Sequence, residues 1–263
     1  MNRPSNTPLL GVETAQGVHT ITLGAAPAHA LSLAMIDALQ EAFEAAGSDP
    51  DVRVIVIDGP GRIFCAGHDM KEMSRHRHDA DAGAAFMDTL FSRCSDMMLT
   101  LAHLRKPTIA IVDGIATAAG LQLSASCDMV FASPTAGFCL PGVTNGGFCT
   151  TPAVAVSRVI GKRALMEMML SGETMDSDWA LRHGLITRII PSERLSREAH
   201  SFAKTLAARN PTPIQDGKAA LLAHQTLSLE DAYKIATPVM VAHLMDEGRQ
   251  AKDKASKFYQ SKS

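Results

Sequence analysis

The sequence predicts an α/β fold, built as a spiral of ββα units and followed by a C-terminal helical segment. Apolar, β-branched runs of strand length recur along the chain, with amphipathic helical patterns between them. These strand-loop-helix units follow one another without a fixed sequence period. After Pro191 the pattern is helical throughout. We therefore expect a core over residues 1–191 and a helical segment over residues 192–263.

The first expected elements are a hairpin and a helix. Residues 9–13 and 18–23 alternate as strands do, and a short turn with Gly17 separates them. Ser32 is a favourable N-cap for a helix that ends near Gly47. The apolar positions of this helix have helical spacing: Leu33, Ile36, Leu39 and Phe43.

The middle of the chain alternates between strands and helices. Residues 52–57 and 108–112 read as buried strands. Residues 71–83 show no apolar period, which predicts an exposed loop. A long amphipathic helix is expected from Phe86 to Lys106-Pro107, and another helix from about Ala118.

The last third is expected to be mainly helical. Short strands are predicted at 128–132, 137–140 and 185–190, with helices at 151–160, 162–170 and 177–183 between them. The C-terminal helices are expected to break at 210–213 and near Thr237-Pro238.

The composition excludes several classes of partner. The 263 residues are 46% hydrophobic and 20% charged with a net charge of −2, which offers no field for nucleic acid or a membrane surface. No apolar run approaches the roughly 18 residues of a membrane span. The first eight residues lack the apolar core of a secretory signal. Five cysteines without metal-ligand spacing argue against a disulfide framework, so we expect a cytoplasmic protein.

Two strand-turn units carry the main functional signal. Both buried strands end in Asp-Gly and lead into small residues, at 64–70 and at 114–122. Small side chains allow a ligand to approach bare peptide N–H groups. One N–H from each unit would form an oxyanion hole, which binds an oxygen that gains negative charge. The alternative is that small residues only allow tight packing of helix on sheet.

These motifs resemble the crotonase (enoyl-CoA hydratase/isomerase) superfamily. Its pattern F-x-A-G-x-D-x-x-E is present from Phe64 to Glu72, and G-x-x-x-G-G-G-x-x-L begins at Gly114 with Ala118 and Ala119 in place of two glycines. Within the superfamily, Ala-Gly-His-Asp and Ala-Ala-Gly-Leu-Gln-Leu resemble the subgroup called enoyl-CoA hydratase domain-containing protein 3. The resemblance implies a ClpP/crotonase-like β-spiral and a C-terminal segment that packs in a homotrimer or a dimer of trimers.

The resemblance also implies an acyl-CoA thioester as substrate. Coenzyme A is then part of the substrate, with no covalently bound cofactor and no metal. The backbone N–H groups of His68 and Ala119 would be the oxyanion donors. The positions that would hold the coenzyme A portion are Ala66, Gly67, His68, Asp69, Met70, Lys71 and Gly120. Lys71 is the candidate for a phosphate, and the basic tail, with Arg249, Lys252, Lys254, Lys257 and Lys262, is a second one.

The chain departs from the family at the acid/base groups. Hydratases carry glutamates where this sequence has Gln122 and Gly142. Gln122 can hold a water molecule but cannot remove a proton, and Gly142 has no side chain. Loss of a general base costs about 10²–10⁴-fold in rate. Hydration by a pair of glutamates is therefore not expected here.

Other side chains near the two motifs are candidate substitutes for the missing glutamates. His68 has a pKa range suited to proton transfer, although a structural role is the commoner one for a histidine at a turn. Asp69 is expected to cap the following helix, and Cys139 and Cys149 to be small buried residues. The function predicted is that of an enoyl-CoA hydratase/isomerase family enzyme that stabilises a thioester enolate. The alternatives are an acyl-CoA-binding protein, a CoA-thioester decarboxylase and a hydrolase.

Overall fold

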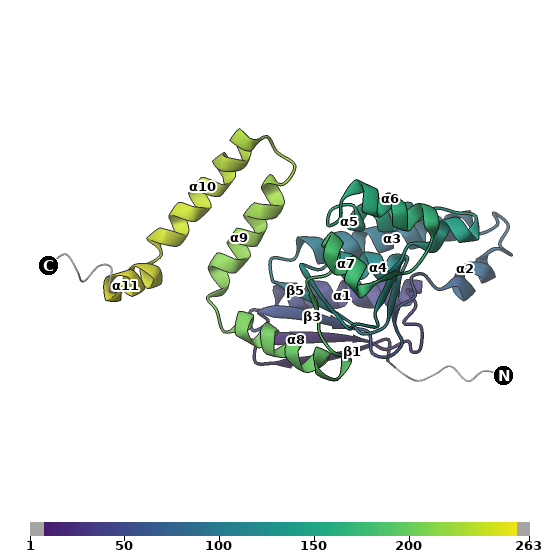
Figure 1. The fold of residues 1–263 in the computed structure, drawn as a ribbon, viewed down its shortest axis with the longest axis horizontal. Coiled ribbons are helices and arrows are strands. Elements are labelled where there is room, and N and C mark those ends of the chain that lie inside the picture. Colours follow the sequence, from purple (N-terminus) through teal and green to yellow (C-terminus); the bar gives the residue numbers. More distant parts are fainter. Residues whose placement is uncertain (1–7, 257–263) are drawn as a thin grey trace. The chain divides into compact units, whose positions relative to one another are not determined.

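The computed structural model describes residues 8–256 and confirms the predicted α/β architecture (Figure 1). The chain forms two compact units that divide between Arg209 and Asn210. This division differs from the expected boundary after residue 191, because one more helix packs on the sheet of the first unit. No helix in the described part of the chain is long and apolar enough to cross a bilayer.

Strands of the first unit belong to two sheets, and the chain alternates between them. The six-stranded sheet has the order β1 (Leu10–Ala15), β2 (Val18–Leu23), β3 (Val54–Asp58), β5 (Thr108–Val112), β7 (Met129–Ala132) and β10 (Arg188–Ile189). The four-stranded sheet has the order β4 (Ile63–Cys65), β6 (Ile115–Thr117), β8 (Gly137–Cys139) and β9 (Met175–Asp176). Successive pairs β3–β4, β5–β6 and β7–β8 add one strand to each sheet, which produces the spiral.

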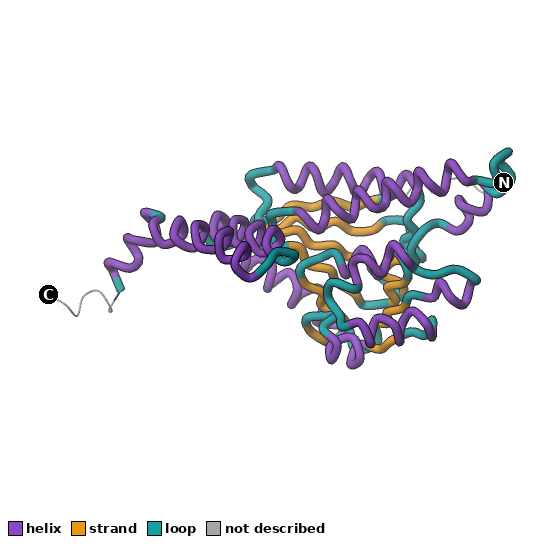
Figure 2. Tube along the Cα trace, turned by 90° about the horizontal axis from the view of Figure 1, so that it is seen from above, coloured by secondary structure: helices purple, strands orange, loops and turns teal. Residues whose placement is uncertain are grey.

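Helices cover both faces of the six-stranded sheet (Figure 2). Val54 and Val56 face the cluster of α8 (Ser192–Ala207), which contributes Leu195, Ala199 and Ala203. Ile55 and Ile57 face the opposite cluster, to which α1 (Leu33–Ser48) and α3 (Ala84–His103) contribute. Because both faces are buried, the strand reads as an unbroken apolar run instead of an alternating one.

Shorter helices fill the remaining connections. They are α2 (Met70–His76), α4 (Ala119–Ala125), α5 (Thr150–Val156), α6 (Lys162–Ser171) and α7 (Ser177–His183), with a 3₁₀ turn at Pro141–Asn145. The predicted cap of α1 is confirmed, since the Met35 N–H donates to the Ser32 hydroxyl over 3.2 Å.

The second unit is helical. It contains α9 (Pro211–His224), α10 (Leu229–Met245) and α11 (Glu247–Ala255), and α9 and α10 form an antiparallel pair (Figure 1). The break predicted near Thr237-Pro238 is wrong, because Pro238 lies inside α10. A proline already has a helical φ, and it removes only one hydrogen bond where the remaining ladder continues.

The expected loop at 71–83 is also partly wrong. Its first turns form α2, and the Asp69 carboxylate caps that helix by accepting the Lys71 and Glu72 N–H groups over 2.8 and 3.2 Å. This helix buries no residue fully, so capping and not an apolar period signals it. The predicted strand at 185–190 is shorter than expected, since only β10 pairs.

Candidate active site

The fold brings the two small-residue motifs together. Gly67 has a φ of +81°, and a Cβ added to it would lie 3.1 Å from the Ala119 nitrogen. A Cβ added to Gly120 would overlap the carbonyl group of Cys65, at the end of β4. Because the approach at Gly120 excludes even a methyl group and that at Gly67 is tight, the end of β4 and the start of α4 are in direct backbone contact.

This contact leaves two backbone donors without partners. Within residues 8–256, neither the His68 N–H nor the Ala119 N–H donates a hydrogen bond. One neighbour of each is engaged: the Asp69 N–H donates to the Leu31 carbonyl over 3.2 Å, and the Ala118 N–H donates to the Cys139 carbonyl over 3.0 Å. The His68 and Ala119 N–H groups therefore remain unpartnered on either side of the contact between Gly67 and Ala119.

Ala118 sets the direction in which α4 begins. Its φ of +50° and ψ of −121° belong to a region that L residues rarely adopt. This turn allows its own N–H to reach β8 while the next N–H stays free. Backbone strain of this kind costs about 1–3 kcal/mol and persists only where the surroundings enforce it.

The His68 imidazole lies beside these donors in an apolar environment. Its ring stands edge-on to Phe91 of α3, at 4.8 Å between ring centroids and an interplanar angle of 78°. Its Nε2 is buried and has no hydrogen-bond partner among the described residues. Burial lowers the pKa of His68 to about 4, so the ring is neutral at pH 7.

Gln122 lies one turn into α4 and is only 4% exposed. Its side-chain Oε1 is buried without a partner in the described part of the chain. Its main-chain carbonyl is occupied, because it accepts the Ser126 hydroxyl over 2.8 Å. A buried amide oxygen without a hydrogen bond lowers the stability of the fold. Oε1 is therefore an acceptor that a bound molecule or a water could satisfy.

The volume beside Gly142 is already filled. A Cβ added to Gly142 would lie 2.8 Å from the Cys149 nitrogen and 2.9 Å from its sulfur. The Gly142 N–H donates to the same sulfur over 3.2 Å. Burial raises the pKa of Cys149, so this group is a thiol and not a nucleophilic thiolate.

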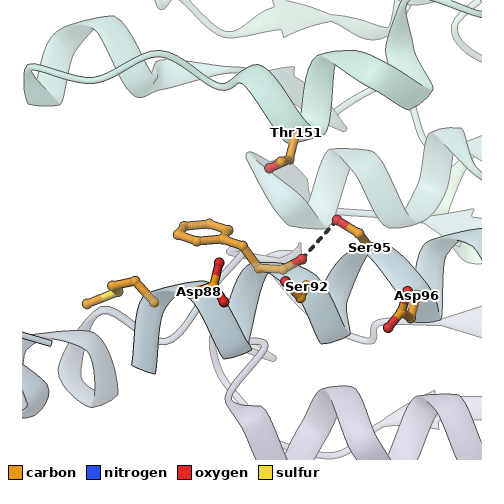
Figure 3. A pocket seen from close by; sticks show the side chains of 7 residues that line it. Asp88, Ser92, Ser95, Asp96 and Thr151 are labelled. Atoms are coloured by element: carbon orange, nitrogen blue, oxygen red, sulfur yellow. Dashed lines mark hydrogen bonds between the residues drawn. The ribbon is translucent and has the colours of Figure 1, made fainter. Parts of the chain in front are cut away.

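An open pocket of about 580 Å³ lies between α3 and α5 (Figure 3). Phe91 belongs both to this pocket and to the contact with His68, so the imidazole and the pocket share one wall. Figure 3 shows Ser95 donating to the main-chain oxygen of Phe91, over 2.8 Å. The lining residues are Met87, Asp88, Phe91, Ser92, Ser95, Asp96 and Thr151.

The residues predicted to hold coenzyme A divide into two groups. The Ala66 N–H is occupied by the Ala28 carbonyl over 2.9 Å, and the Asp69 carboxylate caps α2 as predicted. Met70 is 70% exposed and Lys71 is exposed beside it, so both are free to contact a ligand from solvent. In the basic tail, Lys257 and Lys262 lie outside the described residues.

Two residues of the site were not predicted. Glu72 reads as a solvated helix residue, yet its Oε2 accepts the Leu33 N–H over 2.9 Å and ties α2 to α1. The E of the first motif is the signal that marks it. Phe91 has no such signal, because its contact with His68 joins distant segments. Among the described residues, no group of three or more His, Cys, Asp or Glu side chains is placed to hold a metal ion.

Comparison with known proteins gives a consistent result. The sequence profile of the family described as enoyl-CoA hydratase/isomerase matches residues 13–260. Enoyl-CoA hydratase domain-containing protein 3, mitochondrial, from Xenopus laevis is 36% identical over 247 residues, which cover 93% of this chain and 82% of the relative.

Solved structures agree in fold. An enoyl-CoA hydratase/isomerase family protein from Silicibacter pomeroyi is 59% identical with a TM-score of 0.87, covering 90% of this chain and all of that one. Human enoyl-CoA hydratase domain-containing protein 3 is 32% identical with a TM-score of 0.88, covering 97% and 99% of the two chains. The resemblance to this subgroup, read from the motifs, is confirmed.

The expected cytoplasmic location is contradicted by this comparison. The relatives from Xenopus laevis, Rattus norvegicus and Homo sapiens are all named mitochondrial. The prediction rested on cysteines that form no disulfide, and all five are indeed free. Free thiols indicate a reducing compartment but do not say which one.

Proposed function

Since the chain belongs to the enoyl-CoA hydratase/isomerase family, we propose that it binds an acyl-CoA thioester and stabilises the enolate of its acyl group. The observation that carries this proposal is the pair of unpartnered N–H groups of His68 and Ala119, beside the contact between Gly67 and α4. Two unpartnered donors on either side of one backbone contact would suit an oxygen that gains charge during the reaction.

The pair of donors would act on the thioester carbonyl oxygen. When a proton leaves the neighbouring carbon, or a nucleophile adds one carbon further on, negative charge moves onto that oxygen. Removal of one such donor typically costs about 10²–10³ in rate. Both donors belong to the backbone, so the oxyanion hole does not depend on the side chain at position 68 or 119.

Hydration of a 2-enoyl-CoA is the first candidate reaction. The unpartnered Oε1 of Gln122 supports it, because an amide oxygen can hold and orient a water molecule. An amide does not remove a proton, however, so Gln122 would position the water and another group would receive the proton.

Decarboxylation of a carboxyacyl-CoA is the second candidate. The neutral His68 ring, the Gln122 amide and the bare Gly142 favour it, since none of these three positions carries a negative charge that would repel the carboxylate of the substrate. Carbon dioxide leaves, its bond electrons enter the enolate, and no general base is needed. The remaining alternative is an acyl-CoA-binding protein without turnover.

The coenzyme A portion would lie along the first motif. Exposed Met70 and Lys71 are available to it, and Lys71 provides a positive charge for a phosphate. Coenzyme A enters as part of the thioester substrate in this proposal, which includes no metal and no separate cofactor.

Incubation with crotonyl-CoA tests the proposal. Loss of the enoyl-thioester absorbance is followed for the wild type and for Gln122→Ala, and carbon dioxide release from a carboxyacyl-CoA is followed in parallel. Hydration that Gln122→Ala abolishes supports the first reaction. Carbon dioxide release without hydration supports the second. Tight binding of both thioesters with no turnover contradicts enzymatic function.

A homotrimer, or a dimer of trimers, is the proposed assembly. The second unit presents large exposed apolar side chains, which a solvated helical unit rarely carries. They include Leu229, Tyr233, Met240 and Met245 on α10. Light scattering of the purified protein, with Tyr233→Ser and Met240→Ser as variants, tests this assembly.

A further inference from the structure

We propose that the His68 imidazole is the proton-transfer group of this site, acting through Nε2 on the carbon next to the thioester carbonyl. The inference rests on the proposed function and assigns the base that Gln122 and Gly142 do not supply. The role of the backbone N–H of residue 68 is separate from that of its ring.

Position is the first argument. The His68 N–H is one of the two free donors, so the carbonyl oxygen would be bound directly to this residue's backbone. The imidazole of the same residue then lies within one side-chain length of the carbonyl oxygen. The carbon that loses or gains the proton is two bonds from that oxygen.

The unpartnered nitrogen is the second argument. Nε2 is buried and accepts or donates no hydrogen bond among the described residues. A buried polar atom without a partner costs about 1–3 kcal/mol, so a structural histidine would be expected to be satisfied. In the tautomer protonated on Nδ1, the lone pair of Nε2 is free to receive a proton.

The surroundings explain how such a ring can replace a carboxylate. Burial brings the pKa of His68 to about 4, close to the value of about 4.3 for an ordinary glutamate. The ring is therefore unprotonated at neutral pH, as a base must be. Its proton affinity matches that of the missing glutamates, although its charge does not.

The Phe91 side chain links the His68 imidazole to the open pocket. The Phe91 ring covers one side of the imidazole and forms the wall of the open pocket between α3 and α5. An acyl group held in the pocket would contact the same Phe91 side chain that packs against the imidazole.

Other side chains of the site are less suited to this role. The Cys149 thiol has a raised pKa, and the Asp69 carboxylate is occupied by two N–H groups of α2. Gln122 does not titrate. Among the side chains that the two motifs bring together, the His68 imidazole alone combines burial, a free lone pair and a suitable proton affinity.

The proton-transfer step balances without a further reactant. The C–H bond next to the carbonyl breaks, its proton moves to Nε2, and its electron pair forms the carbon–carbon double bond of the enolate. The carbonyl π electrons move onto the oxygen between the two N–H donors. Return of a proton from the imidazolium restores the thioester and the neutral ring.

Exchange of the α-hydrogens of butyryl-CoA in D₂O, followed by NMR, measures this step without hydration. The variants are His68→Ala and His68→Gln, and both keep the backbone N–H. His78→Ala is the matched control, since it removes an exposed imidazole from the segment after α2. We expect exchange to fall about 10²–10⁴-fold in both His68 variants and to be unchanged in the control.

Rescue by free imidazole distinguishes chemistry from structure. Added imidazole should restore part of the exchange rate in His68→Ala, with saturation, and leave His68→Gln unchanged. Exchange within a few-fold of wild type in both His68 variants overturns this inference and leaves the enolate proposal intact. Loss of exchange without rescue assigns His68 a structural role, which also overturns it. A wild type that binds butyryl-CoA without exchange contradicts both proposals.

Discussion

Gly120 of α4 rests directly on the main chain of Cys65, so closely that a methyl group at position 120 would overlap the Cys65 carbonyl group. This contact joins the second motif to the end of β4. It also fixes where the N–H of the preceding residue, Ala119, points relative to Gly67. The geometry of the candidate site therefore depends on a backbone approach more than on any side chain.

Gly120→Ala should lower the free energy of unfolding by at least about 3 kcal/mol, because a rigid backbone contact cannot relax as a flexible side chain can. Gly217→Ala is the matched control, since a Cβ there meets nothing within 4 Å. Because position 217 lies in the interior of a helix, this substitution should raise the free energy of unfolding by about 0.5–1 kcal/mol. Denaturant unfolding measures both, and equal effects would contradict the contact.

Ala118→Gly should raise the thermal unfolding midpoint by a few degrees. Glycine accepts a φ of +50° without strain, and relief of about 1–3 kcal/mol exceeds its flexibility cost of roughly 0.5–1 kcal/mol. Ala116→Gly, in β6 and without a positive φ, should lower the midpoint. Scanning calorimetry compares the two, and a lower midpoint for Ala118→Gly would show that position 118 is unstrained.

Glu72→Ala should destabilise the protein by about 1–3 kcal/mol, because the Leu33 N–H at the start of α1 loses its acceptor. Glu72→Gln keeps an amide oxygen in the same place and should retain most of the stability. Urea unfolding of both variants tests the bond between α2 and α1. An alanine variant as stable as the glutamine variant would refute it.

His68 should make the fold less stable as pH falls. The unfolded chain binds a proton near the ordinary value of 6.5, whereas burial holds the native pKa at about 4. The contribution of the neutral His68 ring to the free energy of unfolding is therefore fully present above pH 6.5. It is lost as pH falls from 6.5 to about 4, and the loss is at most about 3 kcal/mol.

His68→Gln, which does not titrate, should remove this loss. Half-buried Asp58, whose pKa is raised by desolvation, contributes with the opposite sign in wild type and variant alike, so the difference between their pH curves isolates His68. Identical curves for the two proteins between pH 4 and 7 would argue against a buried, neutral ring.

Gly142→Glu should not create a hydratase. Its Cβ would lie 2.8 Å from the Cys149 nitrogen, so the glutamate has no room and the turn must move. We expect a lower unfolding midpoint and no gain in crotonyl-CoA hydration. Gly161→Ala, with nothing within 4 Å of the added carbon, is the control for handling and expression. A clear gain in hydration activity would contradict this expectation and would show that Cys149 moves aside for the glutamate side chain.

Much of the fold follows from local pattern. The sequence predicts β5 and α7 with the bounds they have, since one is a fully buried run and the other follows the Asp176 cap. The three-residue strands β4 and β6 are not predicted, because they are too short to show a period in the sequence. Their pairing depends on contacts between segments about 50 residues apart, which no local pattern records.

The same division holds for the site. The small residues at 67 and 120 mark the place where two backbones approach, so their role can be expected from residue type and motif order. The edge-on contact of His68 with Phe91, and the occupation of the space beside Gly142 by Cys149, are products of tertiary packing. Sequence reasoning therefore finds the candidate residue His68 without the surroundings that set its protonation state.

The alternation of the chain between two sheets has a consequence for variation in length. The N–H groups of His68 and Ala119 are held by neighbouring strands, β4 and β6, whereas the chain between them crosses α2, α3 and β5. Insertions or deletions around residues 77–83 would therefore change this connection while the strand pairing that holds the two N–H groups stays the same. The candidate site can thus keep its backbone geometry while the segment between its two halves varies in length.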